Sequence, residues 1–280
     1  MPPATHSDPF ETSALPLLRL RRVMTPFTRA EVRVLVGSFT STGSLWDGVA
    51  ARAVGAAGMA RGETLVSASL ADYGLSATLA AVRAGLKSIV VTPESVSQER
   101  RDGLLSLGAT VERMPEGTPL DQLWARAQSI ASGISGGWAV APTQADVDAI
   151  VGPPLSDLGL ADAFVCGAGS GMTFRAGVAA LRPARTVLLH AGGPHHVQGW
   201  GGRDAGRELS ADDVLEVSDV QAWQMRTRLA REEGLLTSLS GAANVVGALD
   251  VAARLPAGAC IYTVVWGTGE RDFSLGRYFP

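Results

Sequence analysis

Residues 163–173 read Ala-Phe-Val-Cys-Gly-Ala-Gly-Ser-Gly-Met-Thr. The first four residues suit a buried strand, and the small residues that follow favour a tight turn into a helix. Such a turn brings backbone N–H groups together at a helix N-terminus, where an anion is stabilised. Ser170 and Thr173 would add hydroxyl donors. Two interpretations stay open: an anion-binding loop, or a turn that only lets a helix pack closely.

The same order of strand, turn and helix recurs along the chain. Short β-branched runs predict strands at 64–68, 88–92, 138–141, 163–166, 186–190 and 259–265; helical patterns predict helices at 73–84, 98–107, 219–233 and 241–254. This alternation predicts an α/β protein of three-layer α/β/α type, with mostly parallel sheets covered on both faces. A Pro-Pro pair within 146–159 follows a lobe boundary expected near 140–150. The six glycines of 192–207 predict a loop.

The composition is that of an ordinary globular protein. The 280 residues are 46% hydrophobic, and no apolar run approaches the roughly 18 residues of a membrane span. A net charge of −3 provides no basic field for nucleic acid or anionic lipid. The first residues show no pattern of a signal peptide, and both cysteines, Cys166 and Cys260, lie in apolar runs where reduced core residues are expected. We therefore expect a cytoplasmic protein with no membrane or nucleic-acid partner.

Two further turns lead into expected helices: the first enters a helix that runs through 50–58, and the second lies between the strand 64–68 and the helix 73–84. They are Thr42-Gly-Ser-Leu-Trp-Asp-Gly48 and Ser69-Leu-Ala-Asp-Tyr-Gly74. Open α/β sheets bind ligands at the carboxyl ends of their strands, which gives Asp47 and Asp72 a possible site role. A structural alternative exists for both: Ser44 would cap its helix with Asp47 at the third position, and Asp72 would cap the helix that starts near Tyr73.

Taken in order, these segments resemble the cysteine synthase, threonine synthase and tryptophan synthase β family, the fold-type II enzymes of pyridoxal phosphate (PLP). Residues 15–20 are similar to the family's opening TPLxxL, and residues 42–47 to PTGSxKD. Residues 62–66 with 69–74 resemble the strand and loop ending in TSGNTG, and residues 93–100 with 107–111 resemble the next helix and strand. Residues 169–173 resemble the phosphate-binding GTGGT, residues 217–219, 229–236 and 240–243 resemble late family segments, and residues 269–274 resemble GERYLS.

The resemblance implies a two-lobed, tryptophan synthase β-like fold that forms a homodimer. Its smaller lobe would be 36–143, with the asparagine-loop equivalent. Its larger lobe would combine 1–35 and 144–280, with the phosphate-binding loop. A small-molecule ligand would lie in the cleft between the lobes.

The family's PLP-binding lysine is replaced by Trp46 in this alignment. The 24 basic residues are 23 Arg and the single Lys87. Arginine stays protonated and forms no Schiff base. Lys87 is expected at the surface, ahead of the strand 88–92, so PLP chemistry through Lys87 is the least favoured hypothesis. An internal aldimine and a lysine base are therefore not expected.

The asparagine loop also departs from the family. Its role, by resemblance, is to bind a substrate carboxylate and to contact the cofactor's ring oxygen. Leu70 and Tyr73 add bulk to this loop, and an ionised Asp72 would repel both anionic groups. Ordinary handling of α-amino acids is therefore not expected.

The candidate site follows from the resemblance and from residue chemistry. The candidates for proton transfer are Asp72, Tyr73, Asp47, His195 and His196. The candidates for cofactor or phosphate contact are Gly169, Ser170, Gly171, Met172, Thr173, Trp46 and Ser240, the last facing the pyridine nitrogen; those for ligand contact are Ser69, Leu70, Ala71 and Gly199. The loop 195–200 is expected at the cleft mouth, either as a plain polar loop or as a source of acid–base groups. No metal is expected, because the histidine pair lacks further ligand spacing.

Two functional hypotheses follow. The first is a divergent enzyme, a lyase or a condensing or β-replacement enzyme of specialised metabolism, which binds a phosphate-bearing ligand or a PLP adduct noncovalently. The altered Trp46, Asp72 and Tyr73 favour this hypothesis. The second is a noncatalytic homologue that binds a ligand or regulates an active partner. Trp46 would either fill the vacated site as core or stack on a ligand.

Overall fold

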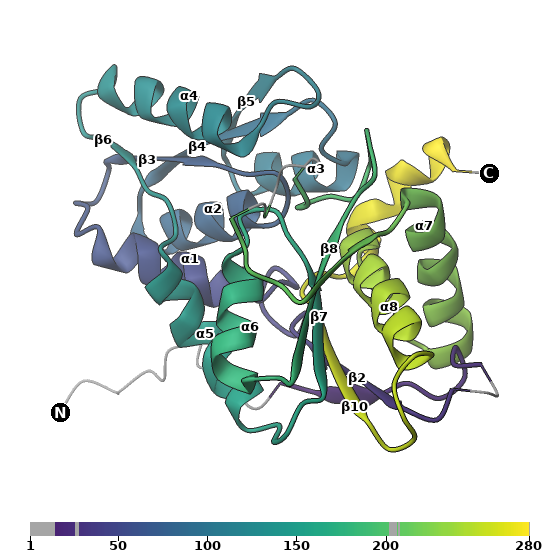
Figure 1. Ribbon diagram of the computed structural model, residues 1–280. Coiled ribbons are helices and arrows are strands. Elements are labelled where there is room, and N and C mark those ends of the chain that lie inside the picture. The colour runs from purple at the N-terminus through teal and green to yellow at the C-terminus, as the bar shows by residue number, and fades with distance from the viewer. Residues whose placement is uncertain (1–14, 26–27, 202–205, 207, 280) are drawn as a thin grey trace, which may run out of the picture.

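The computed structural model describes residues 15–25, 28–201, 206 and 208–279, which build two lobes around two sheets (Figure 1). The larger sheet has the strand order β1-β2-β10-β7-β8-β9. Its strands are β1 (Leu17–Arg19), β2 (Glu31–Val36), β10 (Cys260–Val265), β7 (Ala163–Gly167), β8 (Arg185–His190) and β9 (Asp213–Glu216). All neighbours pair in parallel except β1 and β2.

The smaller sheet is entirely parallel, in the order β5-β4-β3-β6. Its strands are β3 (Thr64–Ala68), β4 (Lys87–Pro93), β5 (Thr110–Met114) and β6 (Gly137–Ala139), and its helices are α1 (Trp46–Ala56), α2 (Tyr73–Ala84), α3 (Gln98–Ser106) and α4 (Leu120–Ser132). These elements lie within 46–139. The predicted lobe limits of 36–143 stay a prediction.

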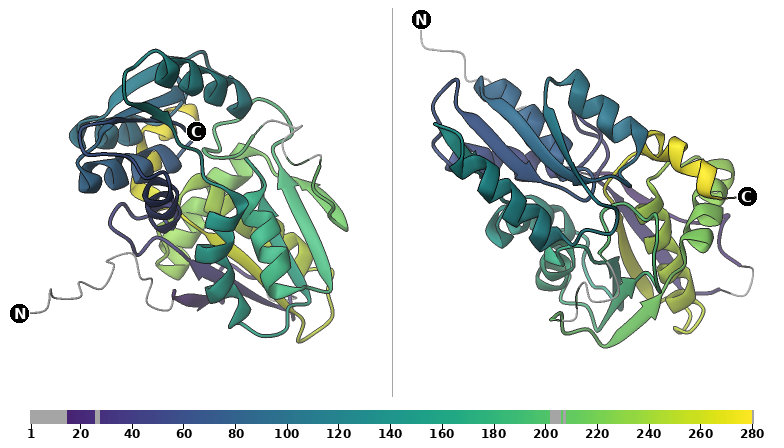
Figure 2. Two further views of the ribbon diagram at one scale, coloured as in Figure 1. Left: turned by 90° about the vertical axis from the view of Figure 1, so that its left-hand side faces the viewer. Right: turned by 90° about the horizontal axis from the view of Figure 1, so that it is seen from above.

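Helices cover both faces of each sheet, as Figure 2 shows from two further directions. The larger sheet is covered by α5 (Gln144–Ser156) and α6 (Met172–Leu181) on one face, and by α7 (Asp219–Arg228) and α8 (Leu239–Ala252) on the other. A π-helical turn, η1 (Leu229–Glu233), extends α7, and a 3₁₀ helix, η2 (Gly269–Tyr278), ends the chain. Because both faces are covered, strands such as β3 are buried at every position.

The predicted fold class is confirmed, and most predicted elements are present. Three local differences have clear causes. Lys87 is the first residue of β4 rather than part of the preceding loop, because it pairs with Thr64. The Pro-Pro segment is helical: α5 begins with a capping box of Thr143 and Asp146 and carries its prolines in the last turn. The short edge strand β9 was not predicted.

Both sheets direct the carboxyl ends of their strands toward the space between the lobes. Strands β7 and β8 lead into the loops 167–171 and 191–201, while β3 and β4 lead into the loops 69–72 and 94–97. Residues of all four loops line the same group of cavities. The fold therefore places the candidate site where open α/β sheets bind ligands.

Candidate functional site

Three adjoining cavities lie between the lobes. The inner cavity, of about 90 Å³, is bordered by Trp46, Asp72, Gly169, Trp200, Ser240 and Trp266. The aromatic recess, also about 90 Å³, is bordered by Trp46, Leu70, Tyr73, Leu120, Trp124 and Met172. The outer cavity, of about 630 Å³, is bordered by Leu70, Pro93, Thr118, Leu120, His195 and Gly199.

The glycine-rich loop 167–171 is covered by another segment of the chain. A Cβ atom placed on Gly167 would lie 2.1 Å from the indole of Trp200. A Cβ atom on Gly169 would lie 2.0 Å from the carbonyl oxygen of Gly199. The small residues are therefore required for close approach of Gly199 and Trp200. The rest of the loop, Ser170, Gly171 and Thr173, still borders the inner cavity.

The loop 193–201 reaches from the larger lobe to the smaller lobe. Trp200 is 6% exposed and belongs to the core of the larger lobe, and Gly201 N donates to Ala168 O over 3.1 Å. The amide of Gln198 accepts from Ser97 N and donates to Ser95 O, both over 3.2 Å. Only part of this loop therefore lies at the mouth of the cleft, because Trp200 is inserted beside the glycine-rich loop.

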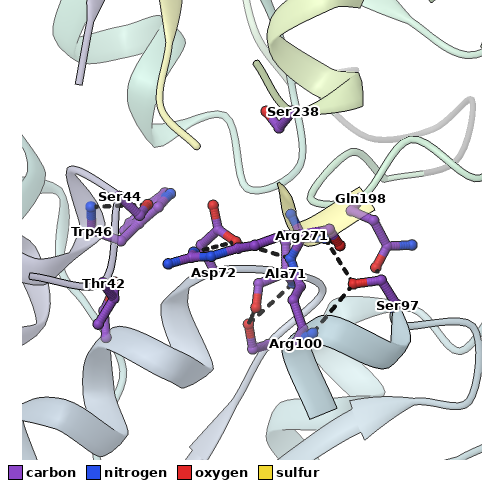
Figure 3. Close-up of polar contacts among 12 residues, drawn as sticks. Thr42, Ser44, Trp46, Ala71, Asp72, Ser97, Arg100, Gln198, Ser238 and Arg271 are labelled. Atoms are coloured by element: carbon purple, nitrogen blue, oxygen red, sulfur yellow. Dashed lines mark hydrogen bonds and ion pairs between the residues drawn. The ribbon is translucent and has the colours of Figure 1, made fainter. Parts of the chain in front are cut away.

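Asp72 belongs to a buried ionic network. Its Oδ1 lies 2.9 Å from Arg100 Nε and 2.9 Å from Arg271 Nη1, and both guanidinium groups point toward it in Figure 3. Arg100 Nη1 also lies 2.5 Å from Asp272 Oδ1. The other carboxylate oxygen of Asp272, Oδ2, accepts a hydrogen bond from Leu239 N. Two guanidinium groups and two carboxylates thus join the lobes.

The charges of this network keep Asp72 ionised. Burial alone would raise the pKa of its carboxyl group, but Arg100 and Arg271 outweigh burial and hold that pKa below its ordinary value. The predicted capping role of Asp72 is wrong: it is the N-cap residue of α2, yet its side chain makes no capping hydrogen bond because it is engaged by the arginines. The same engagement leaves it poorly placed for proton transfer.

Asp47 is fully buried and holds the turn before α1. It accepts hydrogen bonds from Thr42 N (2.7 Å), Thr42 Oγ1 (2.5 Å) and Ser76 Oγ (2.6 Å). The predicted cap by Ser44 is wrong, because Leu45 is the N-cap residue and no side chain caps α1. Ser44 Oγ instead accepts from Trp46 N over 3.4 Å. The turn is thus fixed by Asp47, which does not border the inner cavity, the recess or the outer cavity.

Tyr73 contributes its ring to the recess while its hydroxyl is engaged. The phenol donates to Val140 O over 3.2 Å, and burial raises its pKa well above the ordinary value. The proton is therefore held more firmly than in a free phenol. Tyr73 is suited to packing rather than to acid–base chemistry near neutral pH.

The two histidines diverge. His196 lies against the C-terminal segment: its ring stacks on Tyr278 at 3.9 Å between centroids, and its Nδ1 lies 3.0 Å from Asp219 Oδ2. His195 borders the outer cavity, with Nε2 3.1 Å from Gly201 O. Since a carbonyl oxygen only accepts, this Nε2 carries a proton. Burial lowers the pKa of His195, so its ring is neutral at pH 7.

The remaining candidates divide among the three cavities. Trp46 begins α1, borders both the inner cavity and the recess, and meets Tyr73 edge-on at 5.9 Å. Ser240 borders the inner cavity, where its Oγ lies 3.1 Å from Ser238 Oγ. The other candidates border one or more of the cavities: Ser69, Leu70, Ala71, Gly169, Ser170, Gly171, Met172, Thr173 and Gly199.

The residues of the site that were not predicted include Arg100, Arg271 and Asp272 of the ionic network and Trp124 and Trp266 at the cavity walls, while Trp200 was expected only with its loop at the cleft mouth. Arg100 lies in a predicted helix and Arg271 in a GERxxS-like segment, where an arginine is usually exposed. The sequence does not show that both are buried. The acidic Asp72 was the available signal, since a buried carboxylate requires a cationic partner. The glycines at 167 and 169 were the signal for a large neighbour such as Trp200.

The chain matches the family model described as "Pyridoxal-phosphate dependent enzyme" over residues 12–267. This chain belongs to that family. It is 27% identical over 243 residues to a cysteine synthase of Staphylococcus aureus, covering 78% of each sequence. Its fold is similar to an O-acetylserine dependent cystathionine β-synthase of Helicobacter pylori (TM-score 0.83, 24% identity, 94% and 95% of the chains). It is also similar to an O-ureido-L-serine synthase (TM-score 0.81, 25% identity, 93% and 91%). The family and the cysteine synthase-like relationship predicted from the motifs are confirmed.

The residues of this family member do not fit PLP in the arrangement seen here. The inner cavity of about 90 Å³ is well below the roughly 300 Å³ at which ligand pockets begin. Trp200 and Gly199 lie against Gly167 and Gly169, of which Gly169 is the first residue of the segment 169–173 that resembles the phosphate-binding loop. An anionic side chain, Asp72, stands at the asparagine loop. Lys87 lies at the amino end of β4, roughly 20 Å along the strand from the cleft at Pro93.

Two further searches of the structure concern membranes and metals. Among the described residues, no helix is long and apolar enough to cross a membrane. No group of three or more His, Cys, Asp or Glu side chains within that same part of the chain is arranged to hold a metal ion.

Proposed function

We propose that this cysteine synthase-like protein binds a small molecule in its interlobe cleft without PLP, as a noncatalytic member of an enzyme family. The observation that carries this proposal is the cover over the glycine-rich loop, where Trp200 and Gly199 lie against Gly167 and Gly169. Beside this cover, Ser170, Gly171 and Thr173 border an inner cavity of only about 90 Å³, which is too small for PLP. The outer cavity, at about 630 Å³, has the size of an ordinary ligand site.

The state of the candidate proton-transfer groups supports a binding role. Asp47 accepts hydrogen bonds from Thr42 and Ser76, Asp72 is paired with two arginines, and the Tyr73 hydroxyl donates to the backbone. His196 is stacked on Tyr278, outside the three cavities. A general acid or base must reach a substrate proton. Asp47 and His196 border none of the three cavities, and Asp72 and Tyr73 border them with groups that are already engaged.

A second candidate function, catalysis in the outer cavity, rests on His195. Its ring is neutral and it borders the outer cavity. A neutral imidazole is a general base when its unprotonated nitrogen reaches the substrate. That nitrogen, Nδ1, is buried here, so the ring would have to turn toward the ligand. This hypothesis predicts that His195→Gln abolishes a reaction on a ligand in the outer cavity.

A PLP titration of the purified full-length chain tests the first proposal. We expect the absorbance of free PLP to remain unshifted, and borohydride treatment to leave Lys87 unmodified by mass spectrometry. With O-acetylserine, named for the Helicobacter pylori neighbour, and sulfide, no cysteine should form. An aldimine band, or turnover that PLP stimulates, would overturn the proposal.

Matched tryptophan variants locate the cause. Trp200→Ala removes the indole from Gly167 and should allow PLP to bind noncovalently, detected as quenching of tryptophan fluorescence. Trp138→Ala, the same change at a half-exposed residue of β6, should leave PLP unbound. Trp200→Ala should also cost about 3–5 kcal/mol of unfolding free energy, so a thermal melt must show that the variant is folded at the assay temperature.

A further inference from the structure

We infer that the aromatic recess is a specificity pocket that takes a short apolar group of the ligand, while the ligand's polar part lies in the outer cavity. This inference rests on the proposed binding function and names the chemistry of the ligand. It concerns the region where Trp46 replaces a cationic lysine with an apolar ring.

Three aromatic rings form the floor and sides of the recess. Trp46 and Tyr73 meet edge-on, with 5.9 Å between centroids and 81° between planes. Tyr73 and Trp124 follow at 6.3 Å and 56°. The rings come from three different helices, α1, α2 and α4, so their positions are set by the packing of the smaller lobe. Rings on helices give a preformed surface that a ligand need not order.

The polar side chains at the recess wall are already engaged. The Tyr73 hydroxyl donates to Val140 O, and Ser69 Oγ donates to Ala71 O over 2.8 Å. Asp72 is paired with two arginines, and Ser170 Oγ accepts from Met172 N over 3.4 Å. A ligand hydroxyl or charge placed beside Ser69 or Tyr73 would lose its water and would have to compete with these contacts for a partner. Asp72 Oδ2 and the Ser170 hydroxyl proton, which have no such contact within the described part of the chain, lie where the recess meets the inner cavity. The recess therefore selects an apolar group.

Volume limits the size of that group. The recess holds about 90 Å³, whereas a dry apolar cavity of roughly 150 Å³ is known to bind benzene. A branched or straight chain of a few carbons, or a thioether, fits this space, and a phenyl ring is too large. The recess and the outer cavity share Leu70, Leu120 and Gly199, so one molecule can occupy both.

The outer cavity supplies the polar contacts that the recess lacks. Ser95, Thr118, His195 and Gln198 all border it. A ligand with a short apolar end and a hydrogen-bonding remainder therefore matches the two cavities together. An α-amino acid that presents its carboxylate to the loop 69–72 does not match, because Asp72 and the bulk of Leu70 are there.

Small probes and two opposite variants test the inference. Isobutanol, which has a short branched chain and one hydroxyl, should bind the full-length chain in ligand-observed NMR, and crystals under xenon pressure should show xenon in the recess. Ala71→Leu, at the wall shared with the inner cavity, should weaken isobutanol binding at least tenfold. Trp124→Ala enlarges the recess and should admit benzene, which the unmodified chain excludes. Trp138→Ala is the matched control and should change neither result.

Each outcome has one meaning. Xenon found outside the recess, or isobutanol binding that Ala71→Leu leaves unchanged in a variant shown to be folded by circular dichroism, overturns the inference. Trp124→Ala keeps the test valid if Ala71→Leu does not fold. If the small probes do not bind as expected and the chain binds no PLP, the inference about the recess is contradicted and the proposed function is not. If the unmodified chain binds PLP, the proposed function is contradicted.

Discussion

The inner and outer cavities lie next to each other, yet they are built in opposite ways. The inner cavity is narrow because Trp200 packs on Gly167 and because the ion pair of Asp72 and Arg100 takes up part of its border; Arg271 and Asp272 pair with these two groups. The outer cavity is several times larger and borders on loops of both lobes. The family places its cofactor at the glycine-rich loop, which in this chain belongs to the filled part of the cleft.

This difference separates a part of the cleft that holds the lobes together from a part that stays open. The contacts that fill the inner cavity also join the lobes, since Arg100 is on α3 and Asp272 is on η2. The ion pairs next to the inner cavity thus hold the two lobes in the arrangement that forms the outer cavity. We expect changes at the inner cavity to act on stability and changes at the outer cavity to act on binding.

The largest effect is expected when the inner ionic network is broken. Asp72→Asn removes one of two carboxylates and leaves an uncompensated guanidinium in a buried place, which should lower the free energy of unfolding by about 3–5 kcal/mol. Urea denaturation of the purified chain measures this loss. Asp102→Asn is the matched control on exposed α3, where the carboxylate contacts Gln98, and should change stability by about 0.5 kcal/mol or less.

The pH dependence of Asp72 gives the same comparison a second measurement. Its folded pKa is depressed, so its stabilising contribution is present above the unfolded pKa, near 3.8, and is lost as the pH falls through the lower folded value. Asp72→Asn should therefore flatten the acid limb of the stability curve. An acid limb that is unchanged in the variant would show that Asp72 carries no net charge interaction.

A smaller loss of stability is expected from a change at Asn244 of α8, which borders the inner cavity and hydrogen-bonds two backbone groups. Its Oδ1 accepts from Gly167 N over 2.8 Å, and its Nδ2 donates to Val264 O over 2.9 Å. Asn244→Leu leaves both backbone groups unpaired and should cost about 1–3 kcal/mol. Gln224→Leu, an exposed position on α7, is the control. Equal stability of the two variants would show that the wall does not depend on this amide.

The smallest effect on stability is expected from protonation of His195 at the border of the outer cavity. Burial lowers its pKa below the ordinary 6.5, while Gly201 and Asp219 act in the opposite direction and His196 adds to the lowering. The unfolded chain therefore binds the proton more readily, and stability should fall as the pH drops from 6.5 toward the folded pKa. An NMR titration of the ring should give a midpoint below 6.5; a midpoint above that value would contradict the buried placement.

The fold followed from the sequence because its determinants are local and periodic. The strand at 163–166, its glycine-rich turn and the next helix were readable from residue size and alternation alone. The order of family motifs then fixed the two-lobed arrangement. The edge strand β9 was missed because Asp-Val-Leu-Glu is only four residues long and its two apolar residues are adjacent rather than alternating with polar ones.

The candidate site was only partly readable, because its decisive contacts are long-range. Asp72 meets Arg271 from almost the other end of the chain, and no spacing rule joins them. Trp200 was placed at the cleft mouth with its loop, although its side chain lies within. The burial of Asp72 and Trp200 depends on the folded chain, so the local sequence pattern does not show it. Only in the folded chain does Asp72 pair with two arginines and Trp200 pack against the glycine-rich loop.

The position of β10 has a consequence for biosynthesis. This strand pairs with β2 on one side and β7 on the other, so residues 260–265 complete a sheet whose first strands were made more than 200 residues earlier. The smaller sheet uses strands from 64–139 alone and can assemble while the chain is still being translated. The larger sheet stays in two pieces, with open edges, until residues 260–265 have been synthesised. A nascent chain that stops before Cys260 therefore exposes two unpaired strand edges, the condition under which chains aggregate or recruit chaperones.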